Sequence, residues 1–243
     1  MNIFLKYVFI FLLGSIIGWI IELIYRRILH SKWVNPGFLV GPYLPIYGFG
    51  LVLMNVIYLY FDEQGFSIIA SVVAICLCMT LLELISGLIF LKAGVKLWDY
   101  SDNKFNYKGI ICPTYSLIWL LAALFYIYFI ESKLNVALDW YSNNISFSYV
   151  TGFFSGILAL DFVYSTKLYN RIKEFAKSNN INIIYEKLKI QIKEFQDTSM
   201  QKYSFITPFR QTRSLFDYLA DYVKNNQLFG TDKPDVKKKE KKR

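Results

Sequence analysis

The chain has 243 residues, of which 55% are hydrophobic and 19% aromatic, with a formal net charge of +9 and a mean hydropathy of +0.33. This composition is too apolar for an ordinary water-soluble domain, so a lipid bilayer is the expected solvent. A helix that crosses ~30 Å of hydrocarbon needs about 20 residues with almost no charge. Five stretches meet this requirement and predict an all-α polytopic membrane protein with a transmembrane domain over 1–166: 7–25, 42–61, 66–91, 110–130 and 145–166.

The first stretch is predicted to be a helix of the mature protein. It is too long for the apolar region of a signal peptide, contains Glu22, and has no small-residue cleavage pattern after it. Its Gly14 and Gly18 form a GxxxG pattern, as Gly152 and Gly156 do in the fifth stretch. Such pairs predict close packing of these helices, on each other or on another chain.

The segment 33–50, WVNPGFLVGPYLPIYGFG, contains three of the six prolines of the chain and four glycines. Proline is tolerated in the first turn of a helix, so we favour an interfacial loop that leads into the second membrane helix. The alternative is a broken or re-entrant element, which survives inside a membrane only where protein or water covers it. Four residues of this segment are predicted to line a substrate or ion pathway: Pro42, Tyr43, Pro45 and Tyr47.

The third and fourth stretches repeat features of the first two. The sequence IIELI at 20–24 has a counterpart in LLELI at 81–85, and GFLVGPY at 37–43 has one in GIICPTY at 109–115. The order of these features predicts a two-fold parallel repeat of helix pairs, 1–2 and 3–4, followed by a separate fifth helix. Chance similarity between apolar segments is the alternative.

The region after the fifth stretch is predicted to be an amphipathic helical tail over 167–230. Ile181, Ile184, Leu188 and Ile192 have helical spacing between Lys and Glu residues. The end of the chain, 231–243, is polybasic and predicted to be disordered, with an attraction to anionic lipid. Nucleic acid is not an expected partner, because no reading motif accompanies the charge.

Basic residues predict the orientation, because Lys and Arg in short loops are retained on the cytoplasmic side. The 1–2 and 3–4 connections and the tail are rich in them, whereas the 2–3 connection has none and the 4–5 connection has only Lys133. The N-terminus is therefore expected outside the cell and the C-terminus in the cytoplasm. Lys6 is the one residue that argues against this orientation.

Three ionised side chains lie inside the five stretches, and all are carboxylates: Glu22, Glu83 and Asp161. They precede the nearest following cations by 4, 9 and 6 residues, which places them about 6, 14 and 9 Å inside the cytoplasmic boundary. An acid at such a depth costs roughly 2–3 kcal/mol and normally faces a bundle interior or a wet cavity. If these acids converge, they form a site for a cation, a proton or an amine. For Glu22, a simple i,i+4 ion pair with Arg26 is the alternative.

The sequence lacks the common enzyme signatures. It has no GxxxxGK[ST] phosphate loop, so this chain does not hydrolyse ATP by that route. Its one histidine, His30, lies in a basic loop without HExxH or CxxC company, so no metal site, cofactor or His-based catalysis is expected. Cys76, Cys78 and Cys112 lie in or at the edge of apolar stretches, which argues against a disulfide framework.

Four segments resemble the bacterial family described as putative ABC-transporter type IV, or ABC transporter permease. They are WIIELIYRRI at 19–28, VNPGFLVGPYLPIYGFG at 34–50, LLELISGLIF at 81–90 and WDYSDNKFNYKGIICPTYSLIW at 98–119. The resemblance covers about residues 8–165. It implies a multi-spanning inner-membrane component with a role in transport.

The sequence therefore predicts a permease subunit in a bacterial plasma membrane, working with a separate nucleotide-binding ATPase or as a homo-oligomer. Substrate or a coupling cation would pass near the three acids. Two alternatives remain open. One is a lipid-processing or headgroup-binding membrane enzyme that uses the carboxylates as acid and base. The other is a non-transporting envelope scaffold or regulator whose tail binds a partner.

Overall fold

The computed structural model describes residues 3–92, 94–179, 183–198 and 215–228. Two strands of two residues each, β1 (Val95–Lys96) and β2 (Ile183–Ile184), pair in parallel. A π-helical turn, η1 (Tyr126–Ile130), joins α4 to α5, and a 3-10 turn, η2 (Ile145–Phe147), precedes α6. The helices are α1 (Ile3–His30), α2 (Pro45–Glu63), α3 (Ile68–Lys92), α4 (Pro113–Phe125), α5 (Glu131–Asn143), α6 (Ser148–Ser178), α7 (Tyr185–Thr198) and α8 (Leu215–Leu228). The predicted polybasic segment 231–243 lies outside the described residues.

Five helical stretches are long and apolar enough to cross a membrane: Ile3–Leu29, Pro45–Glu63, Ile68–Lys92, Pro113–Asn143 and Ile145–Ser178. Each contains most of one stretch predicted from the sequence, so the predicted all-α fold with five membrane helices is confirmed. The last two are longer than predicted. Leu134, Leu138 and Tyr141 are buried at helical spacing beyond residue 130, and Leu168, Ile172 and Ala176 do the same beyond residue 166. The apolar face thus continues the helix where the overall hydropathy falls.

Prolines begin two of the membrane helices. Pro45 is the first residue of α2 and follows Leu44, whose backbone is extended; Pro113 is the first residue of α4 and follows Cys112, which is also extended. The missing amide of proline costs nothing at this position, because the first amides of a helix have no partner within it. The segment 31–44 before α2 is irregular. An interfacial loop and a broken or re-entrant element both have an irregular backbone, so the preference for the loop stays a prediction.

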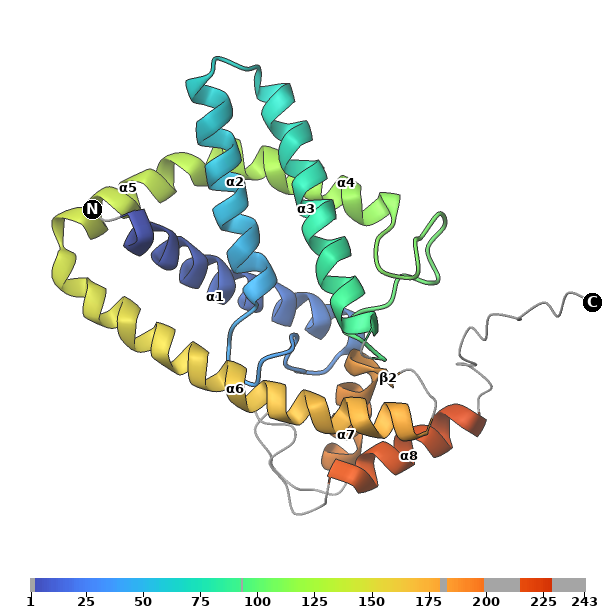
Figure 1. Ribbon diagram of the computed structural model, residues 1–243. Helices are drawn as coiled ribbons and strands as arrows, with labels where there is room; N and C mark the ends of the chain where they lie inside the picture. The colour runs from blue at the N-terminus through green and yellow to red at the C-terminus, as the bar shows by residue number, and fades with distance from the viewer. Residues whose placement is uncertain (1–2, 93, 180–182, 199–214, 229–243) are drawn as a thin grey trace, which may run out of the picture.

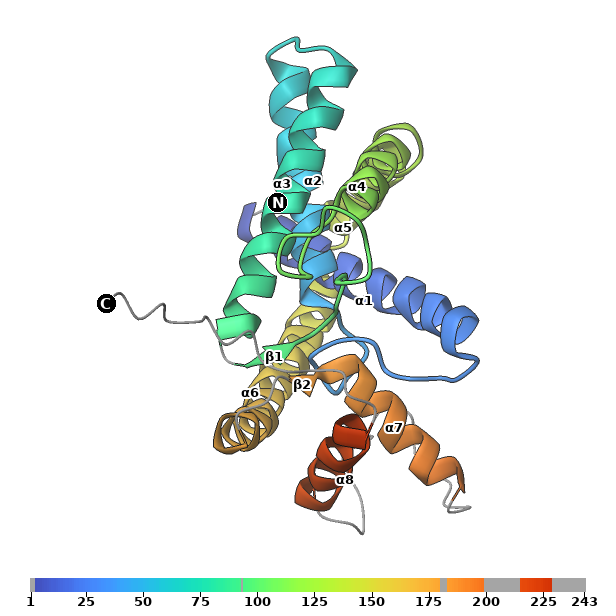
Figure 2. The same ribbon diagram turned by 90° about the vertical axis from the view of Figure 1, so that its right-hand side faces the viewer.

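Successive helices pack side by side, α1 with α2, α2 with α3, and α3 with α4. Figures 1 and 2 show the tip of the α2–α3 hairpin projecting beyond the other helices, with α7 and α8 at the opposite end of the molecule. That end also carries the segments 31–44 and 94–112. We call it the basic side, because it holds the cation-rich connections between the membrane helices.

The two GxxxG pairs have different surroundings. A Cβ added to Gly18 would lie 2.3 Å from Tyr47 Cβ, and one added to Gly14 would lie 2.9 Å from Leu51 Cβ, so both glycines sit directly against α2. By contrast, no described atom lies within 4 Å of a Cβ added to Gly152 or Gly156 of α6. Contact of that second pair with another chain stays a prediction.

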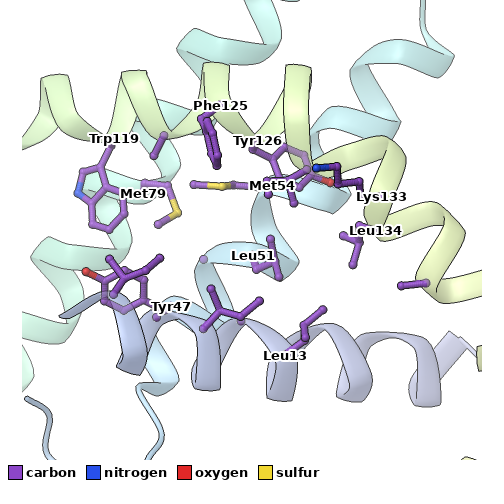
Figure 3. Close-up of a pocket in the computed structure, with 18 residues that line it drawn as sticks. Leu13, Tyr47, Leu51, Met54, Met79, Trp119, Phe125, Tyr126, Lys133 and Leu134 are labelled. Carbon is purple, nitrogen blue, oxygen red and sulfur yellow. The ribbon is translucent and has the colours of Figure 1, made fainter. Parts of the chain in front are cut away.

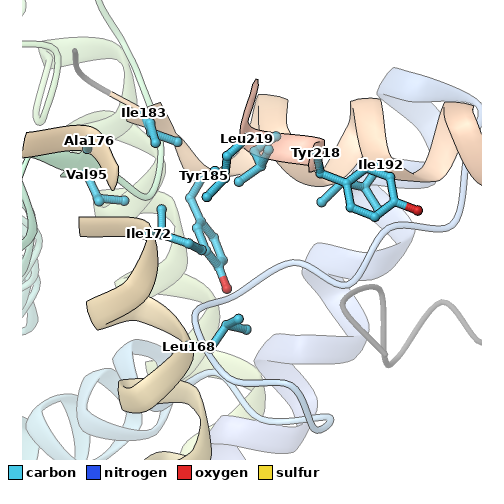
Figure 4. Close-up of a cluster of buried hydrophobic side chains, with 10 residues drawn as sticks. Val95, Leu168, Ile172, Ala176, Ile183, Tyr185, Ile192, Tyr218 and Leu219 are labelled. Atoms are coloured by element: carbon cyan, nitrogen blue, oxygen red, sulfur yellow. The ribbon is translucent and has the colours of Figure 1, made fainter. Parts of the chain in front are cut away.

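Two clusters of buried apolar side chains organise the molecule. The membrane cluster joins α1, α2, α3, α4, η1 and α5 through Ile10, Met54, Val72, Ile75, Met79, Ala123, Tyr126, Ile127, Leu134 and Leu138. The second cluster lies on the basic side and joins β1, the end of α6, β2, α7 and α8 (Figure 4). It consists of Val95, Leu168, Ile172, Ala176, Ile183, Tyr185, Leu188, Ile192, Tyr218 and Leu219. The tail is therefore packed onto the transmembrane helices.

Candidate functional site

Glu83 of α3 is a buried carboxylate held by two neutral donors. Only 4% of the residue is exposed. The Tyr100 hydroxyl donates to Oε1 at 2.9 Å, and the Trp119 indole nitrogen donates to Oε2 at 3.1 Å. Within the part of the chain that the structure describes, Glu83 has no cationic partner. An unbalanced acid inside a membrane protein is a strong candidate for binding a proton or a cationic group.

Tyr100 reaches Glu83 from the segment that follows α3. Its ring stacks on Tyr115 of α4, with ring centroids 3.9 Å apart, and its amide donates to the Gly109 carbonyl at 2.8 Å. Burial and the charge of Glu83 raise the pKa of the Tyr100 hydroxyl, which therefore keeps its proton and remains a donor. The segment 98–115 thus serves to present this donor to α3.

Glu22 of α1 has a different environment, because a cation already balances it. Arg26 Nε lies 3.3 Å from Oε1, and the Tyr47 hydroxyl donates to Oε2 at 3.1 Å. Arg26 also pairs with Glu186 of α7 at 2.7 Å. The i,i+4 ion pair considered from the sequence is present within α1, and the second pair of Arg26, with Glu186, connects α1 to the tail.

The two glutamates lie at the ends of one chain of contacts. Tyr47, which holds Glu22, and Trp119, which holds Glu83, face each other with ring centroids 6.2 Å apart. Residues from α1, α2, α3 and α4 therefore meet at a single point near the basic side. We call Glu22, Tyr47, Trp119, Glu83 and Tyr100 the acid pair site.

Asp161 of α6 does not join the acid pair site. It accepts hydrogen bonds from the backbone amides of Val40 at 3.1 Å and Gly41 at 2.8 Å, and from the Ser165 hydroxyl at 3.0 Å. A Cβ added to Gly41 would lie 2.9 Å from the carboxylate, so glycine permits the close approach. Asp161 thus anchors the irregular segment 31–44 to α6.

The four pathway residues predicted in the segment 33–50 fall into two groups in the structure. Tyr47 belongs to the acid pair site, and Pro45 begins its helix two residues earlier. Pro42 and Tyr43 lie instead on the stretch held by Asp161. Tyr43 is 3% exposed, and its burial and the charge of Asp161 raise the pKa of its hydroxyl.

Asn35 and Lys189 complete the anchoring of segment 31–44, and the sequence interpretation missed both. Asn35 accepts from the Trp19 indole at 2.9 Å and donates to the Val40 carbonyl at 2.6 Å. Lys189 of α7 donates to the carbonyls of Asn35 at 3.1 Å and Gly37 at 2.5 Å. Lys189 is 3% exposed, and its amine lies 4.7 Å from the centre of the Tyr185 ring.

A sequence signal for Lys189 did exist. It lies four residues after Tyr185 and three before Ile192, on the apolar face of an amphipathic helix. Burial and the charge of Arg26 lower its pKa to about 7, against the opposing effect of Asp161 and Glu186. A lysine on the buried face of a helix is rare enough to indicate a specific partner.

A pocket of about 360 Å³ lies between α1, α2, α3 and the α4–α5 helix (Figure 3). Tyr47 and Trp119 are drawn at one end, so the acid pair site lies next to the pocket. Its walls are otherwise almost entirely apolar, with Lys133 as the one charged lining residue. In the described part of the chain, no group of three His, Cys, Asp or Glu residues could hold a metal ion.

The chain was compared with models of known protein families. The model of the family described as putative ABC-transporter type IV matches residues 9–166, which include all residues of the acid pair site. The family resemblance noted in the sequence is thereby confirmed. No solved structure matches the chain.

Proposed function

The chain belongs to the family described as putative ABC-transporter type IV, and from that premise we propose that it is the permease subunit of a bacterial plasma-membrane transporter. Five apolar helices and this family make it a multi-pass membrane component of transporter type. The acid pair site is its proposed substrate or ion site. The basic side is proposed to face the cytoplasm, because it carries the cation-rich connections.

The proposal rests on the different partners of the two glutamates. Glu22 has Arg26 at 3.3 Å, whereas Glu83 is buried with only the neutral donors Tyr100 and Trp119. A carboxylate that lacks a cation in a poorly solvated site gains most from a proton or a cationic group. We assign Glu83 the role of binding the transported or coupling cation, and Glu22 the role of positioning Tyr47.

Energy is proposed to come from a separate chain. The sequence has no phosphate loop, so a nucleotide-binding ATPase would have to dock on the basic side. There α7 contacts both Arg26 and the segment 31–44, through Glu186 and Lys189. Movement of α7 would therefore be passed to α1 and to the start of α2.

Co-purification tests the partner. The full-length protein is isolated from native membranes in mild detergent, and the chains that accompany it are identified. An ATPase recovered in fixed ratio is the expected result. Recovery of the chain alone, as a monomer or a homo-oligomer, would refute the ATPase-driven form of the proposal.

Neutralisation of Glu83 tests the site. In vesicles that contain the protein and show transport, Glu83→Gln should lower the rate by roughly tenfold or more, because the amide keeps the shape of the side chain and loses its charge. Glu63→Gln, which changes an exposed carboxylate at the last residue of α2, at the tip of the α2–α3 hairpin, is the matched control. An unchanged rate in Glu83→Gln would end the assignment of this acid to the pathway.

A further inference from the structure

The pocket between α1 and the α4–α5 helix is long, narrow and apolar. Along the nearly continuous α4–α5 helix its lining extends from Trp119 to Ala137, eighteen positions apart, or about 27 Å at 1.5 Å per residue. Lys133 lies fourteen positions, or about 21 Å, from Trp119. Its volume of about 360 Å³ is at the low end for ligand pockets. A long pocket of small volume suits an extended chain better than a ring system.

The pocket is open toward the space that hydrocarbon would occupy. Three of its lining residues are about half exposed: Ile17 at 45%, Ile21 at 54% and Phe125 at 57%. Figure 3 shows Leu13 on α1 and Phe125 on α4 pointing into the gap from opposite sides. An apolar molecule could therefore enter sideways from the membrane without crossing water.

The wall of the pocket contains adaptable elements. Tyr126 and Ile130, the first and last residues of the π-helical turn η1, both line it, and π-turns inside helices are frequent at functional sites. Met54 and Met79 line it as well. Methionine is flexible and fits its shape to varied apolar partners.

Lys133 makes the two ends of the pocket chemically different, because it places a positive charge at one of them. It lies at the end opposite Tyr47 and Trp119 (Figure 3), and among the described residues it has no ion-pair partner. The nearby Glu131 carboxylate accepts a hydrogen bond from Asn135 instead. An unpaired ammonium at the rim of an apolar pocket complements an anionic group on the occupant.

We propose that this pocket binds a single-chain amphiphile with a carboxylate head, such as a long-chain fatty acid, its chain along the α1–α4 wall and its head at Lys133. The inference goes beyond the proposed transport role. Occupancy requires neither ATP nor flux, so its test is separate from the tests of the acid pair site.

The test uses hexadecanoic acid that carries a diazirine in mid-chain, added to the purified full-length protein in detergent and photolysed. Saturable labelling of peptides from α1, α2 and α4 is the expected result. The methyl ester of the same probe should label the same peptides about fivefold more weakly, because it has no charge for Lys133. Labelling that never saturates, or that spreads over all membrane helices, would overturn the proposal.

Two variants locate the site. Lys133→Gln should weaken binding of the acid about fivefold and leave the ester unchanged, whereas Lys104→Gln, in an exposed connection, should change neither. Ala122→Phe fills the pocket and should weaken both probes by roughly tenfold. Leu117→Phe, on the exposed face of the same helix, is its control.

A melting curve of each variant separates loss of binding from loss of fold, and Ala137→Phe fills the other end of the pocket if Ala122→Phe does not fold. Equal binding of acid and ester by the wild-type protein would refute the role of Lys133. Stronger competition by vesicles of an anionic phospholipid than by the free acid would refute the single-chain occupant.

Discussion

The lysine that docks the tail predicts a dependence on pH. Lys189 is buried against segment 31–44, and its pKa falls from the usual 10.5 to about 7. The Lys189 amine keeps its proton up to pH about 10.5 when the tail is undocked, whereas it releases the proton above pH about 7 when the tail is docked. Docking is therefore weakest below pH 7 and strengthens as the pH rises toward 10.5, with a full difference of roughly 5 kcal/mol.

The accessible part of this range is enough for a measurement. Between pH 6.5 and 8.5 the docking equilibrium should rise roughly 25-fold, because the docked amine loses its proton there and the undocked amine does not. The other charged or titratable groups that act on Lys189 or Tyr185 are Arg26, Asp161 and Glu186. Burial raises the pKa of Tyr185 above its ordinary value, so its hydroxyl stays neutral throughout.

Hydrogen exchange of α7 in the purified protein, corrected at each pH for the intrinsic rate of an unfolded chain, measures this equilibrium. Protection of 185–198 should increase with pH in the wild type and in Lys187→Met, an exposed lysine on the same helix. It should be flat in Lys189→Met, which keeps the length of the side chain and loses the proton. Protection that falls with pH, or an equal slope in Lys189→Met, would refute the reasoning.

Further predictions concern packing and anchoring. Gly18→Ala should lower the free energy of unfolding by about 1–3 kcal/mol, because the added methyl group would lie 2.3 Å from Tyr47. Gly156→Ala should change the melting temperature of the isolated chain little, because no described atom lies within 4 Å of its added methyl group. Equal effects of the two substitutions would contradict the packing of α1 on α2. Asp161→Asn turns an acceptor of two backbone amides into a group that also donates, and should cost about 1–3 kcal/mol. If its melting curve matched that of the wild type, the carboxylate would not be what anchors Gly41.

The membrane helices could be predicted because each is specified by its own residues. Hydropathy over about 20 residues is a local property, and so are the proline starts at Pro45 and Pro113. The lengths of the fourth and fifth helices were underestimated for a related reason. A hydropathy average falls when one face becomes polar, although Leu134, Leu138 and Tyr141 still bury the other face.

The site was only partly predictable, because the depth of a residue in the membrane does not reveal which way its helix face turns. Spacing in the sequence predicts that Glu22, Glu83 and Asp161 all lie in the cytoplasmic half of the membrane, but only the two glutamates contact the aromatic pair of Tyr47 and Trp119. The partners of Asp161 lie 120 and 121 positions earlier in the chain. A pairing over such a distance has no local signature in a single sequence.

The anchoring of segment 31–44 also determines the order in which parts of the protein can fold during synthesis. Its carbonyls at Asn35 and Gly37 are satisfied by Lys189, which lies 154 and 152 positions further along the chain. At about 5–20 residues per second, a ribosome needs roughly 8–30 s to make that distance. Until then the carbonyls of Asn35 and Gly37 lack Lys189, and an unsatisfied backbone carbonyl is tolerated only in contact with water or another donor. The first helix pair therefore reaches its final form only after the fifth helix and the tail have been synthesised.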